Sequence, residues 1–434
     1  MITMITVIHL HCFTISENWI NMRSLGYCVA FAVFCFLLSC SPLGIERPGQ
    51  ISYNESSPLT KAEQEQLSGI NSFAFELARV IQKDSGNNSF VFSPLNMACE
   101  LGMLSEGAGG ETRSEICKAL GFGENGQEDI NAFCKKLLVV SSSSESEECE
   151  LEIANAAAIN RGNGFLVINH YKEIIESSYE AVVVNNNFHE ESIAQYINYW
   201  AEYKTHGKIQ SLLDSSVNYS DYSAFFVSSL FLKAPWNIPF QQTITQYEIF
   251  TSMSGQRRVR MMRNFAFGGY YETRSFRAVS LALGRMRKYV MTFILPKKNS
   301  TVNKVLQSMD GDIWSEIVLS FSNYKPLDVK IPSFNVETEI DLLKLLKDCG
   351  IKSISDPLKA DFSRITNKNM SVEMIKHKAK VSVNEAGVEI VSATDDGMMS
   401  GPPIKQIQFL CDSSFVFAIS EMSSGTMLHL GVYR

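Results

Sequence analysis

The sequence predicts an α+β fold, with helices concentrated early in the chain and strands concentrated late. Near the start, apolar residues recur at helical spacing, at Ile70, Phe73, Leu77, Val80 and Ile81. Near the end, residues 378–383 alternate polar with apolar side chains, which is the period of a β-strand. No regular alternation of strand and helix joins the two parts, so a parallel α/β sheet is not expected.

Turn and cap signals place the elements between these two regions. Residues 90–92 read as a short strand, and Ser93 with Pro94 reads as the N-cap and first residue of a helix that Gly107 ends. A second helical face at 193–200 is closed by Gly207. Residues 342–346 begin another helix. Strands are expected at 224–232, 289–295, 329–331, 404–411, 415–420 and 427–432.

The composition is that of a globular protein, with 434 residues, 45% of them hydrophobic and 20% charged. This length fits one large domain or two smaller ones. The net charge of −7 gives no reason to expect nucleic acid or an anionic membrane as a partner.

The first 44 residues resemble a leader with a secretory signal. Arg23 precedes an apolar run at 27–38 and small residues at 39–41, so Met22 is the expected start. The run is short for a membrane anchor, and residues 37–40 also resemble a bacterial lipoprotein cleavage site. Residues 45–61 are expected to be an N-terminal tail, and 62–434 a single domain. The protein is therefore predicted to be secreted and extracellular.

Glycosylation signals and cysteines fit this compartment. Five Asn-x-Ser/Thr sites are candidates for glycans, at Asn54, Asn87, Asn218, Asn299 and Asn369. Four of the ten cysteines lie in the leader, and the other six are scattered, which allows one or two disulfides but no disulfide scaffold.

No catalytic apparatus is expected. The sequence has no HExxH, no Gly-x-Ser-x-Gly and no phosphate-binding loop, and the glycines at 121–126 follow a helical stretch instead of a strand. His377 and His429 are interpreted as structural residues in strands. The prediction is a protein that is not an enzyme and has no cofactor or metal.

Residues 257–288 hold nine basic residues against one acid, Glu272. This stretch is either a basic surface spread over several strands or a site for a polyanion such as a glycosaminoglycan. The residues for the second interpretation are Arg257, Arg258, Arg260 and Arg263.

The segment from Glu385 to Pro403 is the main functional candidate. It joins two expected strands through nearly twenty residues, and loops of this length are usually functional. Its first half is tolerant of a strand, and its tip, Met-Met-Ser-Gly-Pro-Pro, suits an exposed loop. We therefore expect a segment that can be either a loop or a sheet strand.

Four blocks of the chain resemble the serpin family, from about residue 62 to the end. They are 90–97 (FVFSPLNM) with 104–112 (LSEGAGGET), 198–209 (NYWAEYKTHGKI), 231–236 (FLKAPW) with Met261 and Met262, and 377–379 (HKA) with 409–419 (FLCDSSFVFAI). The resemblance implies a serpin fold of three β-sheets and about nine helices, with an exposed reactive-centre loop at about 385–403.

The resemblance also implies a suicide mechanism. A serine protease cleaves the loop and forms an acyl-enzyme, and the freed loop then inserts into the main sheet and distorts the protease. The implied hinge residues are Glu385, Gly387, Val388, Ile390, Val391, Ser392, Ala393 and Thr394. The implied sheet-opening residues are Ser93, Asn96, Thr205, Ser228, Trp236 and Ser333.

The sequence departs from the family pattern at several of these positions. Bulky β-branched residues follow Gly387, where inhibitors favour small ones, and Asp396 would face inward in an inserted strand. Ser333 stands where a basic residue is usual, so Glu385 lacks its expected ion-pair partner unless another residue supplies it.

The tip resembles that of antitrypsin-like members, which places the reactive bond at Met399-Ser400. The alternatives are Met398-Met399 and, by counting from Gly387, Gly401-Pro402. Methionine suits an elastase- or chymotrypsin-like protease. The expected function is therefore a monomeric, secreted serine-type endopeptidase inhibitor, and the alternative is a non-inhibitory serpin acting as a carrier or chaperone.

Overall fold

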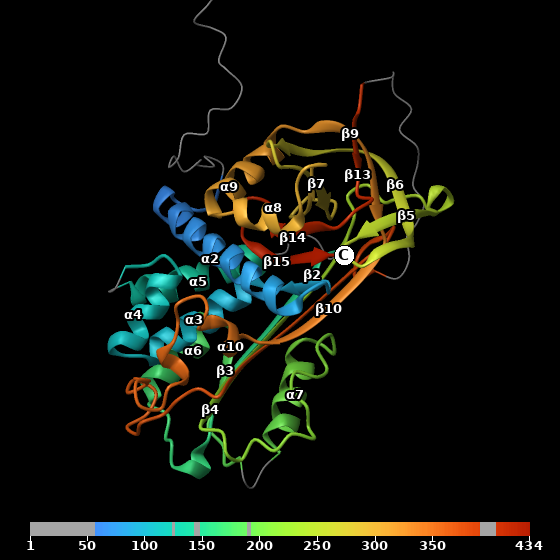
Figure 1. The fold of residues 1–434 in the computed structure, drawn as a ribbon. Helices are drawn as coiled ribbons and strands as arrows, with labels where there is room; N and C mark the ends of the chain where they lie inside the picture. Colours follow the sequence, from blue (N-terminus) through green and yellow to red (C-terminus); the bar gives the residue numbers. More distant parts are fainter. Residues whose placement is uncertain (1–56, 124–125, 143–147, 189–191, 391–404) are drawn as a thin grey trace, which may run out of the picture. The chain divides into compact units, whose positions relative to one another are not determined.

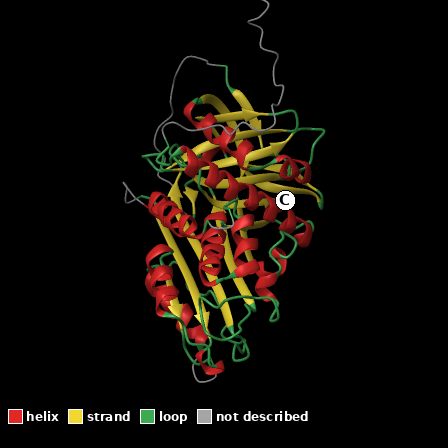
Figure 2. Ribbon diagram, turned by 90° about the vertical axis from the view of Figure 1, so that its left-hand side faces the viewer, coloured by secondary structure: helices red, strands yellow, loops and turns green. Residues whose placement is uncertain are grey.

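Two β-sheets, one of six strands and one of nine, form the framework of the molecule (Figures 1 and 2). The computed structural model describes residues 57–123, 126–142, 148–188, 192–390 and 405–434. All of them belong to one compact unit, Ile51–Arg434. The predicted leader, most of the predicted tail and the tip of the candidate loop lie outside the described residues.

The six-stranded sheet has the order β10-β11-β12-β4-β2-β3. Its long strands run side by side through the lower half of Figure 2. Its strands are β2 (Glu150–Ile159), β3 (Ala181–Val184), β4 (Ala224–Pro235), β10 (Phe334–Asp341), β11 (Met374–Val383) and β12 (Gly387–Val388).

The nine-stranded sheet has the order β1-β15-β14-β8-β7-β6-β9-β13, with β5 paired to β6. Its strands are β1 (Phe90–Phe92), β5 (Gln246–Ser252), β6 (Gly255–Glu272), β7 (Phe276–Leu283), β8 (Tyr289–Pro296), β9 (Lys325–Pro332), β13 (Ile407–Leu410), β14 (Phe415–Glu421) and β15 (Met427–Tyr433). The end of β6 pairs with β7, whereas its earlier part pairs with β9 and β5. The three expected sheets are therefore the six-stranded sheet and two sheet portions that share β6.

The described residues include nine α-helices, most of which lie on one side of the six-stranded sheet. In Figure 1 the sheet is seen nearly edge-on, with α7 on one side and α3 to α6 on the other. The helices are α2 (Lys61–Ser85), α3 (Pro94–Gly107), α4 (Gly110–Ala119), α5 (Gln127–Ser142), α6 (Asn169–Ser178), α7 (Ile193–Lys204), α8 (Val302–Ser308), α9 (Gly311–Leu319) and α10 (Leu342–Leu346).

Both faces of strand β4 are buried, which explains its nearly unbroken apolar sequence. Phe225 and Val227 pack in a cluster with Ile197 of α7, while Phe226 and Leu230 face the main core on the other side. This two-sided burial puts the centre of the sheet between α7 and the helices of the core.

The local signals in the sequence correspond to the observed elements. Ser93 caps α3 by accepting a hydrogen bond from the Asn96 backbone N–H, with Pro94 as the first helical residue. Strand β11 buries Ala379, Val381 and Val383, as its alternation predicts.

The part of the chain that the structure describes contains no disulfide, no metal-binding cluster and no helix that could span a membrane. None of its six cysteines is in a disulfide. It also contains no cluster of side chains able to hold a metal ion. No helix in it has the length and apolar character needed to cross a membrane.

Candidate functional site

The seam between strands β4 and β11 is the structural feature that a loop strand would have to enter. The two strands are parallel, and residues 225–230 of β4 pair directly with 374–379 of β11. We call this the closed seam. Above it, residues 231–234 and 380–383 are not paired with each other, and β12 lies between the strands there. We call this the open seam.

The first residues of the candidate loop already occupy the open seam. Val388 pairs antiparallel with Ala234 on one side and with Val383 on the other, and it is 1% exposed. The chain reverses at Asn384, whose backbone N–H donates to the Gly387 carbonyl at 3.0 Å. The Asn384 side chain accepts from the Ala386 N–H at 2.8 Å. The start of the loop is thus a strand of the sheet.

Gly387 is required by the space and the backbone conformation at this turn. Its φ is +157°, and a Cβ atom there would lie 2.3 Å from the Ala234 carbonyl oxygen. No side chain fits at that distance. The glycine therefore lets β12 approach β4 closely enough to pair with it.

The loop leaves the sheet at Glu389, which the predicted hinge did not include. Its φ is +53°, in the left-handed region that ordinary residues rarely adopt. Its N–H donates to the Ser382 carbonyl at 2.8 Å, and Lys380 lies 3.2 Å from its carboxylate. Ile390 is half-buried, while Val391, Ser392, Ala393 and Thr394 lie outside the described residues. No sequence signal marks a glutamate for this conformation.

Trp236 anchors the turn from the β4 side. Its indole N–H donates to the Asn384 carbonyl at 2.8 Å, and its backbone N–H donates to the Ala386 carbonyl at 3.0 Å. The Phe240 N–H reaches the Glu385 carbonyl at 2.9 Å. These bonds satisfy the carbonyls of a turn that would otherwise be buried without partners.

Arg260 supplies the ion-pair partner that Ser333 does not provide. Its guanidinium lies 2.7 Å from the carboxylate of Glu385, which is 3% exposed. Ser333 contributes differently, because its hydroxyl donates to the Val383 carbonyl at 3.0 Å and its N–H donates to the Arg260 carbonyl at 2.8 Å. Strand β6 therefore holds the turn from outside the six-stranded sheet.

A buried polar cluster underlies the closed seam. It consists of Ser93, Asn96 and Glu100 of α3, Ser228 of β4 and His377 of β11, all 0% exposed. The Ser93 N–H donates to His377 Nε2 at 2.8 Å, so the proton of a neutral ring is on Nδ1. That nitrogen lies 3.2 Å from Glu100 and from Ser228. The cluster thus links α3 to both strands of the seam.

Several atoms of this cluster have no partner in the described part of the chain. They are Oε1 of Glu100 and both polar side-chain atoms of Asn96. Each buried polar group without a hydrogen bond costs about 1–3 kcal/mol. Burial, with His377 nearby, also lowers the pKa of His429 of β15 to about 3. The region below the closed seam therefore contains buried polar groups with incomplete hydrogen bonding, which lower the stability of the folded chain.

Glu100 was not among the site residues predicted from the sequence, although its place within an apolar helix is unusual for a charged residue. All fourteen residues of α3 are buried, and Glu100 is a charged residue within this apolar helix, close to Met97 and Leu101. A carboxylate at such a position must either pair or remain unsatisfied.

A groove of about 340 Å³ lies over the seam. Residues 207–211, the segment that follows α7, form part of its lining. Thr205 ends α7, with its hydroxyl donating to the Ala201 carbonyl at 2.6 Å and accepting from the Ile209 N–H at 3.0 Å. Lys378 holds the segment to β11 through the Ser211 carbonyl at 3.2 Å. A strand that entered the seam would lie next to this segment.

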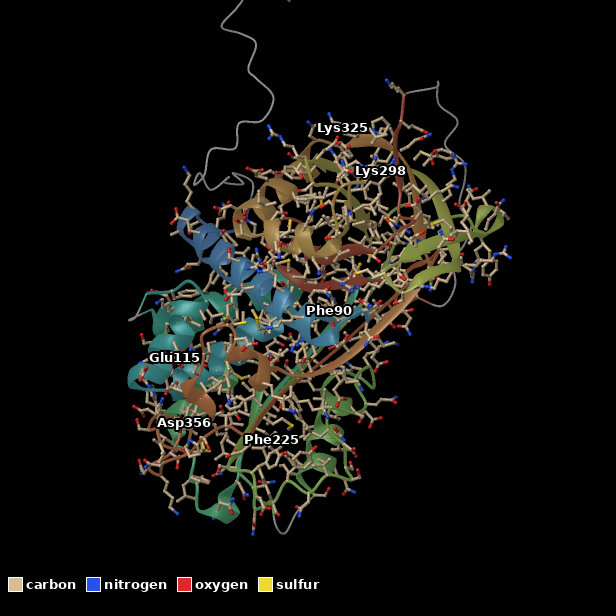
Figure 3. All side chains as sticks on the ribbon, viewed as in Figure 1. Phe90, Glu115, Phe225, Lys298, Lys325 and Asp356 are labelled. Carbon is tan, nitrogen blue, oxygen red and sulfur yellow. The ribbon has the colours of Figure 1, made fainter. Side chains whose placement is uncertain are left out.

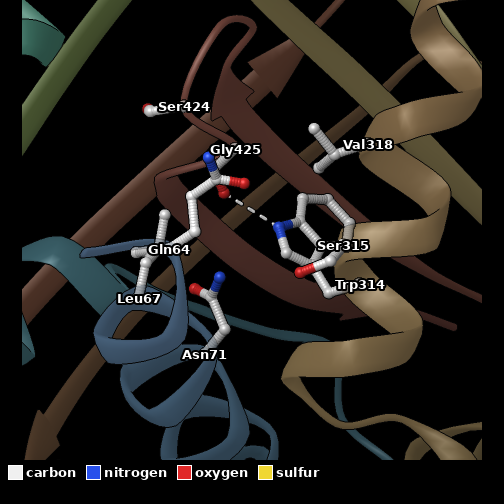
Figure 4. Close-up of a pocket in the computed structure, with 8 residues that line it drawn as sticks. All are labelled: Gln64, Leu67, Asn71, Trp314, Ser315, Val318, Ser424 and Gly425. Carbon is white, nitrogen blue, oxygen red and sulfur yellow. Dashed lines mark hydrogen bonds between the residues drawn. The ribbon is translucent and has the colours of Figure 1, made fainter. Parts of the chain in front are cut away.

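A smaller pocket between α2 and α9 has no room for an organic ligand (Figure 4). The indole of Trp314 lines it and donates to the Gly425 carbonyl at 2.9 Å. The remaining cavity of about 20 Å³ is enough for one water molecule.

Comparison with known proteins identifies this architecture. The family model for serpins, described as serine protease inhibitors, matches residues 68–434. The chain belongs to the serpin family. A serpin-like protein of Thermococcus kodakarensis is 28% identical, with 85% of each chain covered. Iripin-2 of Ixodes ricinus is 29% identical, with 87% of this chain and 93% of that protein covered.

Human thyroxine-binding globulin has a similar structure, with a TM-score of 0.75 and 24% identity over 85% of this chain and 98% of that one. At this identity the likeness shows the serpin fold alone. The expected serpin fold is confirmed by the family match and by these neighbours. Serpins are inhibitors of serine proteases, which is the general function of the family.

The other predicted site residues of this serpin divide into two groups. The reactive-bond candidates Met398, Met399, Ser400, Gly401 and Pro402 lie outside the described residues, as does Asn54. The remaining glycosylation candidates Asn87, Asn218, Asn299 and Asn369 are all exposed, as attachment of a glycan requires.

Two of the four arginines considered for polyanion binding are neutralised within the serpin. Arg260 pairs with Glu385, and Arg263 forms a bidentate pair with Asp328 at 2.8 and 2.9 Å. Arg257 and Arg258 lie over aromatic rings, and the guanidinium of Arg257 also donates a hydrogen bond to the main-chain oxygen of Arg434. The free positive charge is therefore smaller than the sequence count indicates.

Proposed function

We propose that this serpin is a secreted inhibitor of serine-type endopeptidases that acts as a suicide substrate. The observation that supports this proposal most directly is Val388, which is paired on both sides and 1% exposed in the uncleaved chain. Insertion of the loop then needs no new starting point. It extends a strand that has already begun.

Extension of β12 replaces one strand pairing by two. The six direct residue pairs of the closed seam are lost, and the new strand pairs with β4 on one side and β11 on the other. Each net ladder hydrogen bond contributes about 0.5–1.5 kcal/mol. Antiparallel pairing is also slightly more stable per residue than the parallel pairing that it replaces.

The side chains next to Val388 suit this extension. With Val388 facing the core, period-two alternation directs Ile390 to the core and Glu389 to the outer face near Lys380. Glu389 changes from a left-handed to an extended backbone, which relieves about 1–2 kcal/mol. The β-branched residues that depart from the inhibitor pattern therefore favour the inserted state, and any penalty falls on the rate of insertion. Asp396 faces inward later and opposes the final steps.

The reactive bond proposed for this mechanism is Met399-Ser400. The protease serine attacks the Met399 carbonyl, the bond to Ser400 breaks, and the released amine takes up a proton while an ester joins Met399 to the protease. Methionine at the cleaved position fits an elastase- or chymotrypsin-like pocket, because it is unbranched and apolar.

The experiment that tests this function mixes the secreted protein with elastase, chymotrypsin or trypsin. We expect an SDS-stable complex with elastase or chymotrypsin and none with trypsin. The variant Met399→Arg should move complex formation to trypsin, because that pocket requires a basic residue. If trypsin does not form a complex with Met399→Arg but the other proteases still do, the reactive bond lies elsewhere.

A thermal melt of the cleaved chain separates the two candidate classes. An inserted loop adds a strand to the sheet, so the cleaved protein should unfold at a much higher temperature than the intact protein. Cleavage without a complex and without this rise would contradict inhibition. That result would favour the carrier or chaperone function, the class to which the name of thyroxine-binding globulin points.

A further inference from the structure

A second cavity, of about 410 Å³, lies away from the loop seam. It is lined by the turn between β5 and β6, the connection from β8 to α8, the connection from β13 to β14, and the residue after β15. Figure 3 shows Lys298, one of its lining residues, in the upper part of the molecule, far from Phe225 in the six-stranded sheet. Nothing in the inhibitory mechanism uses this cavity.

No acidic side chain lines the cavity, and the main-chain oxygen of Arg434 is bound by the guanidinium of Arg257. Lys297 pairs with Glu272 at 2.6 Å. Lys298 is exposed and has no carboxylate partner within the described ranges. The cavity therefore has a positive potential that attracts an anion.

The guanidinium of Arg434, which also lines this cavity, is a second cation without an acidic side chain as partner among the described residues. Arg434 is 6% exposed, and its guanidinium donates to the Gln82 side chain at 2.5 Å and to the Gly86 carbonyl at 2.9 Å, with longer bonds to Asn87 and Asn303. All of these acceptors are neutral. Its Nε has no acceptor in the part of the chain described, and burial lowers the pKa of Arg434.

An uncompensated buried cation is costly, and an anion placed beside it removes part of that cost. In the low dielectric of a protein interior, this attraction acts across several ångströms and does not require a direct contact with Nε. Arg434 thus favours a negatively charged ligand in the cavity that it lines.

Hydroxyl groups around the cavity provide donors for the anionic group. The hydroxyls of Ser300 and Ser414 are covered and have no partner among the described residues. A change of one side-chain torsion turns such a hydroxyl toward the cavity. Two donors of this kind beside two cations form a site suited to a carboxylate or a sulfonate.

The remaining wall is apolar and adaptable. Met253 and Val302 line it together with Pro296. Methionine adjusts its shape to a ligand surface. The volume falls within the range of about 300–1,000 Å³ that holds small organic molecules.

We propose that this cavity binds a small organic monoanion, with its charged group beside Lys298 and Arg434 and its apolar body against Met253 and Val302. A polyanion is a less suitable ligand, because it needs a row of exposed cations. Of the two cations here, Lys298 is exposed but Arg434 is buried. The site is independent of the reactive loop, so it would exist in an inhibitor and in a non-inhibitory serpin alike.

The test measures calorimetric binding of 2-naphthoate to the full chain, with 2-naphthamide as a neutral ligand of the same shape. We expect saturable binding of one 2-naphthoate per chain and at least about tenfold weaker binding of the amide. Absence of 2-naphthoate binding, or equal affinity for the two molecules, would overturn the proposal.

Two lysine variants show whether the proposed cavity is the site. Lys298→Met should weaken 2-naphthoate binding severalfold, whereas Lys304→Met, an exposed lysine of α8 outside the cavity, should leave it unchanged. Equal losses in both variants would indicate a general effect of surface charge and contradict the assigned site. Because both lysines are exposed, neither variant should affect folding. Complex formation with a protease should be the same in both variants.

Discussion

The open and closed parts of the β4–β11 seam are held in opposite ways. In the open seam, the carbonyls of residues 384–386 and the Glu385 carboxylate all have partners, which are Trp236 and Phe240 after β4 and Arg260 on β6. In the closed seam, the strands pair directly over a cluster in which Glu100 and Asn96 keep atoms without partners. The polar groups are therefore better satisfied at the turn than below the closed seam, which the proposed insertion would open. This difference favours extension of β12 over its withdrawal.

The variant with the largest expected effect is Gly387→Ala, which removes the start of the inserted strand. The new Cβ would lie 2.3 Å from the Ala234 carbonyl, so β12 must separate from β4 and expose Val388. Exposure of a buried valine costs about 1.5–3 kcal/mol. We expect cleaved chain to replace the SDS-stable complex, together with a lower midpoint of thermal unfolding.

Gly86→Ala is the matched control for this variant. Gly86 has a positive φ of +60° but open space around it, so the substitution imposes backbone strain without a collision. It should lower stability by about 1 kcal/mol and leave complex formation intact. If Gly387→Ala forms complexes as efficiently as Gly86→Ala, the paired hinge is not the start of insertion.

Arg260→Met should weaken the open seam with a smaller effect. It leaves the buried Glu385 carboxylate without its cation. Because Arg260 is half exposed and partly screened by water, the expected cost is about 1–3 kcal/mol, below that of a fully buried pair. The amides of residues 384–390 should exchange hydrogen with solvent faster, which mass spectrometry detects.

The neighbouring pair on the same strand provides the comparison. Arg263→Met breaks the bidentate pair with Asp328, which lies away from the hinge. It should reduce stability by a similar amount without changing hydrogen exchange at 384–390. Faster exchange there in both variants would show that the effect comes from β6 as a whole.

The sequence predicted the parts of this site that depend on local patterns. The alternation at 378–383, the cap at Ser93 and the long segment after Glu385 all arise from neighbouring residues, and the structure contains the strand and the helix at these places. The resemblance to serpins predicted the fold as a whole, which local patterns alone did not. The predicted hinge also contained the residues that form β12.

The remaining features depend on contacts between residues far apart in the chain. Arg260 and Glu385 are separated by 125 residues, so neither identifies the other by its position. The left-handed backbone of Glu389 comes directly after Val388, which is paired on both sides, and it has no local signature in the sequence. Of these features, only Glu100 could have been predicted from the sequence, because it is a charged residue within an otherwise apolar helix.

Glu100→Met should close the weaker half of the seam. A buried carboxylate oxygen without a hydrogen bond costs about 1–3 kcal/mol, and an apolar side chain of similar size removes this cost. Ser228 remains within 3.2 Å to accept from His377. We expect a higher unfolding midpoint of the intact chain and, because insertion has to open a more stable seam, a larger fraction of cleaved chain per complex formed.

Glu106→Met tests whether the effect of losing a buried carboxylate on stability depends on how well that carboxylate is paired. Glu106 is buried in the same helix but pairs with Arg364 at 2.8 Å and accepts from Asn131 at 2.8 Å. Its loss should destabilise the chain by about 1–3 kcal/mol. If Glu100→Met also destabilises the chain, the incompletely bonded Glu100 carboxylate does not weaken the closed seam.

The smallest expected effect is a dependence on pH, which arises from His429 below the closed seam. Its pKa is about 3 in the folded chain, against about 6.5 for an unperturbed histidine. Between these values the unfolded chain binds a proton that the folded chain does not, so stability falls as the pH falls through this window. At pH 5 the expected loss is about 2 kcal/mol.

His429→Gln should remove this loss, because glutamine does not titrate. The difference between unfolding free energies at pH 7.5 and pH 5 should shrink by about 2 kcal/mol in His429→Gln and stay unchanged in His170→Gln, an exposed histidine. An unchanged difference in His429→Gln would place the acid sensitivity outside the polar region below the closed seam.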